Sequence, residues 1–163
     1  MNRDILCVCY SRTGCTRRAM QEIALALDCE LVDVYDNVRR TGFFGWLRCG
    51  IDAMRKRTHS INRITPARAL SEYRLVILGT PVWAGRCASV MRAFLKRRGL
   101  EIQNAAYVIT HRSEETYRDV FRQMDLYVSH EHVASVSLQL ASTGYHFWRN
   151  QFVKNCADFV TEP

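Results

Sequence analysis

Three hydroxyl side chains surround a single glycine near the start of the chain, in the stretch Ser11-Arg12-Thr13-Gly14-Cys15-Thr16. Hydroxyl groups can donate hydrogen bonds to phosphate oxygens, and glycine lets the backbone approach a ligand closely. The first N–H groups of a following helix would add donors and the positive end of the helix dipole. The stretch therefore suits a phosphate site, although an ordinary capped turn between strand and helix uses the same residue types. Both interpretations stay open from this stretch alone.

Five short apolar runs alternate with helical patterns and must position these residues. The runs predict strands over residues 5–10, 30–35, 74–79, 105–110 and 133–140. Alternation of strands and helices is typical of a doubly wound α/β sheet. Ligands of such sheets bind outside the carboxyl ends of the strands, where the strand order reverses. The hydroxyl-rich stretch directly follows the first predicted strand and so meets that condition.

Helical periodicity also predicts which side chains face the core. After the first strand, Met20, Ile23, Ala24 and Leu27 share one helix face. In the helix before residue 99 we expect Arg92 to point outward, with Gly99 as the residue that closes the helix. In the last helix we expect four inward side chains, namely Trp148, Phe152, Cys156 and Phe159.

Two motifs together resemble the flavodoxin-like proteins that bind FMN. Ser-x-Thr-Gly-x-Thr after the first strand resembles their phosphate loop, and Gly79-Thr80-Pro81-Val82-Trp83-Ala84-Gly85 after the third predicted strand resembles their second flavin loop. The resemblance spans essentially the whole chain. It implies one flavodoxin-like domain over residues 1–163, a three-layer α/β sandwich around a five-stranded parallel sheet of order 2-1-3-4-5.

The same resemblance implies FMN as the cofactor. Ser11 to Thr16 would hold the phosphate, and the second loop would offer backbone groups to the polar edge of the ring. Trp83 would form an aromatic wall, although it could instead anchor the following helix to the core. The residues predicted to bind FMN are Ser11, Arg12, Thr13, Gly14, Cys15, Thr16, Thr80, Pro81, Val82, Trp83, Ala84, Gly85, Thr110, His111 and Arg112.

The third loop, after the fourth predicted strand, departs from the family pattern. Relatives tend to have glycines there, whereas this chain has Thr110-His111-Arg112-Ser113. His111 could be an ordinary surface histidine, and Ser113 could cap the next helix. Cys15 likewise stands where relatives often have asparagine. These departures predict a weaker third contact with the flavin and a lower affinity for it.

The net charge and the cysteine content indicate which partners and which cellular compartment the protein suits. The chain has a formal net charge of +7, which favours acidic partners. Residues 39–57 carry most of this excess and could form a nucleic-acid or membrane-surface patch, or a flap that meets a partner near the cofactor, although a crossover helix with a basic rim is favoured. The seven cysteines include no Cys-x-x-Cys pair, and neither a signal peptide nor a membrane-spanning run is evident, which favours the cytoplasm.

No catalytic or metal-binding residues are predicted. His-Glu-x-x-His and Gly-x-Ser-x-Gly patterns are absent, and His130 and His132, which flank Glu131, are expected in a solvated turn. The resemblance implies an FMN-binding electron-transfer protein with a redox partner of acidic surface. An NAD(P)H-dependent flavin or quinone reductase using bound FMN is the enzymatic alternative, and is less favoured. A non-redox interaction module on the same fold is the third.

Overall fold

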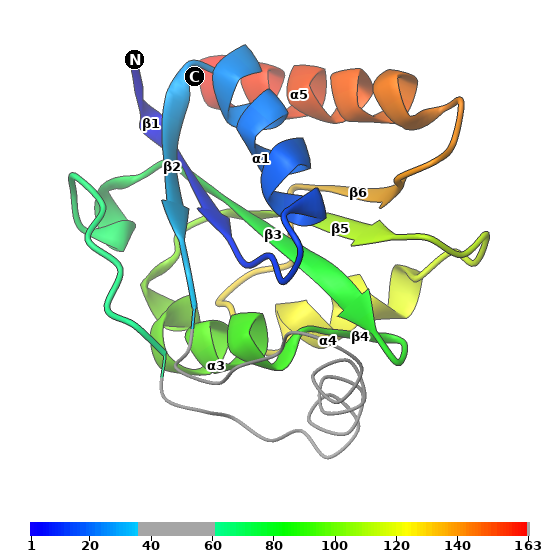
Figure 1. Ribbon diagram of the computed structural model, residues 1–163. Helices are drawn as coiled ribbons and strands as arrows, with labels where there is room; N and C mark the ends of the chain where they lie inside the picture. The colour runs from blue at the N-terminus through cyan, green and yellow to red at the C-terminus, as the bar shows by residue number, and fades with distance from the viewer. Residues whose placement is uncertain (36–60, 163) are drawn as a thin grey trace.

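A computed structural model describes residues 1–35 and 61–162, and these form a parallel sheet between two layers of helices (Figure 1). The strands are β1 (Asn2–Cys9), β2 (Cys29–Asp33), β3 (Leu75–Trp83), β4 (Arg86–Cys87), β5 (Ala105–His111) and β6 (Ala134–Gln139). The helices are α1 (Cys15–Ala26), α3 (Ser89–Arg98), α4 (Arg118–Asp125) and α5 (Tyr145–Thr161), with short 3₁₀ helices η1 (Leu70–Glu72) and η2 (Gly99–Glu101). The predicted α/β class is confirmed.

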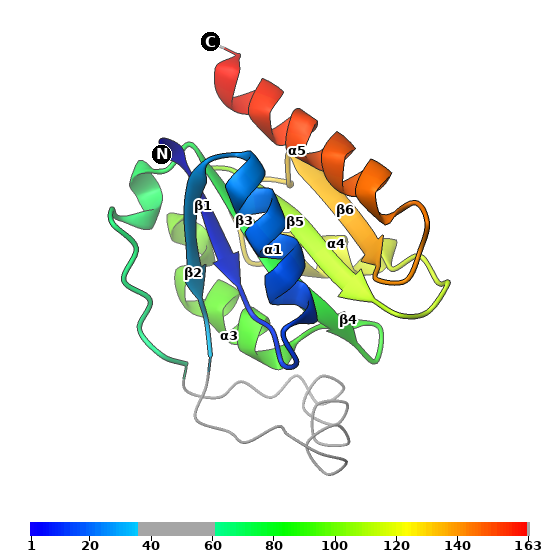
Figure 2. The same ribbon diagram turned by 45° about the horizontal axis from the view of Figure 1, so that its top comes forward.

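The main strands run in the order β2-β1-β3-β5-β6, and all neighbours in this path are parallel. This confirms the predicted order 2-1-3-4-5, since β4 has two residues and pairs only with β3, in antiparallel fashion. Figure 2 shows the arrowheads of β1 and β5 at the same edge of the sheet. The order reverses between β1 and β3, so a crevice for ligands is expected at that edge.

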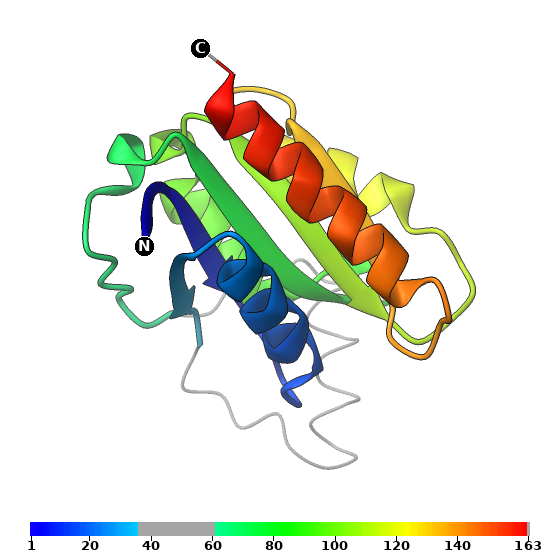
Figure 3. The same cartoon turned by 90° about the horizontal axis from the view of Figure 1, so that it is seen from above.

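Helices lie on both faces of the sheet (Figure 3), and each face has its own hydrophobic core. Helices α1 and α5 cover one face and pack against Ile5, Cys7 and Cys9 of β1. Helices α3 and α4 cover the other and pack against Leu6 and Val8. The alternation along β1 follows from the two-residue period of a strand, and burial on both faces explains its unbroken apolar sequence.

Two glycines allow close packing between elements. A Cβ on Gly79 of β3 would lie 2.4 Å from the Cγ and Sδ atoms of Met20 in α1, so glycine lets this helix approach the sheet. A Cβ on Gly99 would lie 2.1 Å from the carbonyl oxygen of Tyr127. Gly99 closes α3 as predicted, as the residue directly after the last helical one, and its backbone there is right-handed (φ −59°). Its role is to make room for the Tyr127 carbonyl.

Two side chains lie on the opposite side from the one predicted. Arg92 is 4% exposed, and it lines a small cavity together with Cys87 of the hairpin and Leu126 at the end of α4. Trp148 is 56% exposed, since the first turn of α5 extends beside the edge strand β6. Phe152 and Cys156, farther along the same helix, are buried as predicted.

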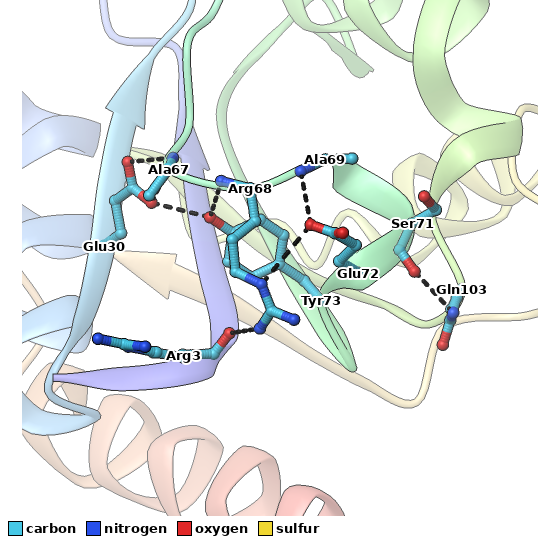
Figure 4. A network of polar contacts seen from close by, with 9 residues as sticks. All are labelled: Arg3, Glu30, Ala67, Arg68, Ala69, Ser71, Glu72, Tyr73 and Gln103. Atoms are coloured by element: carbon cyan, nitrogen blue, oxygen red, sulfur yellow. Dashed lines mark hydrogen bonds and ion pairs between the residues drawn. The ribbon is translucent and has the colours of Figure 1, made fainter.

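A polar network fixes the chain at the opposite, amino-terminal edge of the sheet (Figure 4). The Glu30 carboxylate accepts hydrogen bonds from the Tyr73 hydroxyl (2.9 Å) and the Ala67 backbone N–H (3.1 Å). Burial, and then the Glu30 carboxylate, raise the pKa of Tyr73. The pairing of β1 with β2 shifts register between Asn2 and Leu6, and Arg68 donates to the Arg3 carbonyl within this gap (3.0 Å). The network thus supports strand ends remote from the crevice.

The predicted basic segment 39–57 lies outside the described residues. Among helices within residues 1–35 and 61–162, none is long and apolar enough to cross a membrane.

Candidate functional site

The hydroxyl-rich stretch connects β1 to α1 and leaves the start of that helix uncapped. Gly14 precedes α1 with φ +91°, a conformation that favours glycine, and its N–H donates to the Ser11 hydroxyl oxygen (3.0 Å). No side chain caps the helix, and its first turn contains no acidic residue. These features leave the positive end of the helix dipole open to an anion.

The donor set of this loop fits a phosphate group. The first helical hydrogen bond runs from the Arg18 N–H to the Gly14 carbonyl (2.9 Å), so the preceding amides of the first turn have no acceptor within the helix. Apart from its two chain neighbours, a Cβ built on Gly14 would meet no protein atom within 4 Å, which leaves open space beside Gly14 at the start of the helix. Ser11 and the exposed Thr13 add hydroxyl groups to the same loop.

Thr16 connects this loop to the third one. Its side chain is 2% exposed, and its hydroxyl oxygen lies 2.8 Å from that of Thr110 in β5. The hydroxyl is therefore turned into the protein. This bond fixes the first turn of α1 against β5, a role that the spacing of hydroxyl residues did not indicate.

The second predicted loop is mainly a β-hairpin. Strand β3 continues through Pro81 to Trp83, and the chain returns at once through β4, with Val82 opposite Cys87. Ala84 and Gly85 form the turn with φ +48° and +69°, the conformation of a tight two-residue hairpin. The strand was predicted to end at residue 79, because Thr-Pro resembles a turn in sequence.

Thr80, at the base of the hairpin, is buried. Its hydroxyl accepts the Ala88 N–H (3.2 Å) and donates to the Pro81 carbonyl (3.1 Å). Its side chain therefore holds the hairpin to the start of α3.

Trp83 lies half-buried near the end of β1. Its ring meets the ring of Tyr10 edge-on, with centroids 5.5 Å apart and planes at 88°. Trp83 thus has the protein contact expected of a core anchor, and it keeps part of its surface exposed. Sequence reasoning missed Tyr10, although its position directly before Ser11 was a usable signal.

The third loop divides its side chains between the two faces of the sheet. Thr110 points toward α1, whereas His111 contacts Tyr117 on the other face, with ring centroids 5.0 Å apart. The Nδ1 of His111 lies 2.9 Å from the Ser113 carbonyl, and Nε2 lies 2.7 Å from the Ser137 hydroxyl. Arg112 is exposed. Ser113 does not cap the next helix, since α4 begins after Tyr117.

The described structure brings the three predicted stretches to one edge. Cys9 pairs with Gly79, and Pro81 pairs with Thr110, so the ends of β1, β3 and β5 are adjacent. Burial, and then the carboxylate of Asp33, raise the pKa of the Cys9 thiol to about 12, so this thiol is neutral. Within residues 1–35 and 61–162 no group of three His, Cys, Asp or Glu side chains could hold a metal ion.

Comparisons with known proteins give structural matches only. No family model and no curated protein matches the sequence. The flavoprotein from Lactobacillus acidophilus NCFM, solved in complex with FMN, is 18% identical, with a TM-score of 0.68 over 90% of this chain and 99% of its own. A Bacteroides uniformis protein assigned as a flavoprotein is also 18% identical, with a TM-score of 0.73 over 97% and 99% of the two chains.

A more distant match is the NAD(P)H:quinone oxidoreductase of Methanothermobacter marburgensis. It is 14% identical, with a TM-score of 0.51 over 94% of this chain and 92% of its own. At such identities the likeness concerns the fold, and it confirms the flavodoxin-like architecture.

Proposed function

We propose that this flavodoxin-like chain binds FMN and acts in electron transfer. The uncapped start of α1, with Gly14 at φ +91° and open space at the Cβ position of this glycine, is the observation that carries the proposal. It lies at the reversal of strand order, where folds of this kind bind ligands. The FMN bound to the Lactobacillus flavoprotein supports the choice among phosphate-containing ligands.

The proposed roles follow from the placement of the residues. The first-turn amides of α1, with Ser11 and Thr13, would hold the phosphate. The hairpin around Trp83 would form one side of the ring site, and residues 110–112 would lie on the side of β5. Bound FMN would supply one- and two-electron redox chemistry. The protein would orient the ring and limit its access to water.

The protein's charge supports a redox partner with an acidic surface, since +7 over 163 residues attracts negative surfaces at long range. The described cysteines are all free thiols, although the Cys7 and Cys29 sulfur atoms lie 3.6 Å apart. Free thiols at this density support a reducing compartment, for which we propose the cytoplasm.

The similarity to a quinone oxidoreductase supports one enzymatic alternative, in which NAD(P)H reduces the bound flavin directly. Adding NADPH to the flavin-loaded protein distinguishes the two. Rapid bleaching of the flavin spectrum would favour the reductase, whereas an electron carrier requires a separate reductase protein.

The first test is the visible spectrum of the purified protein, followed by titration of flavin-free protein with FMN. We expect a flavin spectrum, or saturable uptake of FMN, with strong quenching of tryptophan fluorescence. Trp83→Phe should remove most of the quenching. Trp148→Phe is the matched control, because this ring lies on α5 and should contribute little. A protein that is colourless and takes up no FMN would favour a non-redox module instead.

A further inference from the structure

Three polar side chains near the start of β6 form a connected row. The Nδ1 of His132 lies 2.9 Å from Asp125 Oδ2, and Nε2 lies 3.1 Å from the Ser135 hydroxyl oxygen. A carboxylate can only accept, so Nδ1 carries the proton that it donates to Asp125. In the neutral imidazole Nε2 is then left to accept the proton of Ser135. A hydroxyl, a base and a group that orients the base are the parts of an activated nucleophile.

The surrounding structure holds the imidazole in place. Asp125 ends α4 and also accepts the backbone N–H of His132 (3.1 Å), which closes the connection between α4 and β6. The His132 ring lies 5.0 Å from the ring of Tyr107 and 5.7 Å from that of Phe121. The side chains of His132 and Asp125 are 16% and 17% exposed, so their hydrogen bond is largely protected from water. This contradicts the expectation that His132 lies in a solvated turn.

Ser135 is exposed and opens into a groove with a volume of about 540 Å³. The groove follows β6 and has aromatic walls from Phe121, Tyr145 and Trp148. This volume and these walls suit a small molecule with an apolar part.

The free edge of β6 supplies backbone donors beside Ser135. The N–H of Val133 donates to the Ala105 carbonyl of β5 (2.9 Å), and residues along a parallel strand alternate between their two neighbours. The N–H of Val136 therefore points away from β5. Within residues 1–35 and 61–162, β6 has no partner strand on that side. A donor directly after a nucleophile can stabilise negative charge on a substrate oxygen.

The geometry points to Ser135 as a nucleophile toward esters of small carboxylic acids, with His132 as general base and Asp125 as the residue that positions it. The Ser135 oxygen bonds to the carbonyl carbon while its proton passes to His132 Nε2. The C–O bond to the alcohol then breaks, and the alcohol leaves with that proton. Water attacks the acyl-serine with the same help from His132, which releases the carboxylic acid and restores the hydroxyl.

A second histidine and serine on the same groove provide an internal comparison. Ser137 lies two residues farther along β6 and contacts His111, whose Nδ1 faces the Ser113 carbonyl. A neutral carbonyl stabilises an imidazolium less than a carboxylate does. Ser137→Ala is therefore the matched control for Ser135→Ala.

The test uses a fluorophosphonate probe for activated serines and hydrolysis of p-nitrophenyl acetate. We expect one label per chain, mapped to Ser135 by peptide mass. Ser135→Ala should abolish labelling and lower hydrolysis at least about 100-fold, whereas Ser137→Ala should leave both near wild type. Ser135 is exposed, so its variant should fold normally, which circular dichroism checks.

Variants of the two supporting residues complete the test. His132→Gln should lower the labelling rate at least about 100-fold. Asp125→Asn should lower kcat with little change in KM, and Asp125→Glu should restore part of it, which a merely structural residue would not do. Absence of labelling in the wild type, a label on another residue, or unchanged hydrolysis by Ser135→Ala would each overturn the assignment.

Discussion

Replacing Gly14 by alanine should have two separately measurable effects, one on the stability of the protein and one on its affinity for the phosphate of FMN. Apart from the two chain neighbours, the added Cβ would meet no protein atom within 4 Å, so only the backbone at φ +91° opposes the substitution. We expect the flavin-free protein to lose about 1–2 kcal/mol of unfolding free energy for this reason. A phosphate held by the first-turn amides, however, would compete with the new methyl group for the same space.

The expected loss of FMN affinity is larger. A hydrogen bond to a charged group contributes about 1.5–3 kcal/mol, so losing one or two raises the Kd for FMN by roughly ten-fold to ten-thousand-fold. Riboflavin lacks the phosphate, so its Kd should change little. The ratio of the two Kd values therefore isolates the phosphate contact from any change at the ring.

The assay is fluorescence titration of both flavins, with urea unfolding of the flavin-free protein as the measure of strain. Gly85→Ala is the control, because this glycine also has a positive φ (+69°) and open space, but lies in the hairpin. It should lose stability and keep the wild-type ratio. If Gly14→Ala loses stability while its ratio of FMN to riboflavin affinity equals that of the wild type, the phosphate does not bind at α1.

Three further predictions concern the framework around the site. Gly79→Ala should lower the free energy of unfolding in urea by about 1–3 kcal/mol, because its Cβ would overlap Met20. The same substitution should cost less in a Met20→Ala background, and equal costs in both backgrounds would contradict the proposed overlap. Thr16→Val leaves the buried Thr110 hydroxyl without its present partner and should lower the free energy of unfolding by about 1–3 kcal/mol. Thr110→Val should cost less in the Thr16→Val background than in the wild type, and additive costs would refute the coupling. Burial raises the pKa of three thiols above 9.0, so these thiols ionise at lower pH in the unfolded state than in the folded state. The free energy of unfolding should therefore fall from about pH 9 until the folded thiols titrate, near pH 11 or 12. Between pH 8 and 10 the expected loss is about 1.4 kcal/mol per thiol. Urea unfolding at these two pH values measures the loss, and removing one of the thiols should reduce it; those concerned are Cys9, Cys87 and Cys156.

The sequence predicted the sheet well because hydrophobic runs depend on burial, which is a property of each strand. Residues 5–10 and 105–110 are apolar on both faces since helices cover both, and no tertiary detail is needed to see that. The end of β1, and so the start of the first loop, was located for the same reason, whereas β3 continues to Trp83, past its predicted end at residue 79.

Side-chain placement at the margins of helices could not be predicted in this way. Arg92 was assigned to the surface by its charge, but α4 packs beside this turn of α3 and covers it. Trp148 was assigned to the core by its spacing, but α5 extends past the residues that would cover it. Both outcomes depend on neighbouring elements, which local periodicity does not contain.

Hydrogen bonds between polar side chains far apart in the sequence could not be predicted either. The contact of Thr16 with Thr110, and that of Asp125 with His132, depend on backbone register and on the path of a loop. Each residue type alone is common in surface turns.

The strand order has a consequence for synthesis of the protein on the ribosome. Strand β1 lies inside the sheet, between β2 and β3. The first turn of α1 is held by a hydrogen bond between Thr16 and Thr110, which is 94 positions later in the chain. At about 5–20 residues per second, these two threonines emerge roughly 5–20 seconds apart. During that interval the loop from Ser11 to Thr16, which we propose to hold the phosphate, exists without the strand that supports it. Loading of a flavin should therefore wait until most of the chain has left the ribosome, and nascent chains that stop before β5 should not retain one.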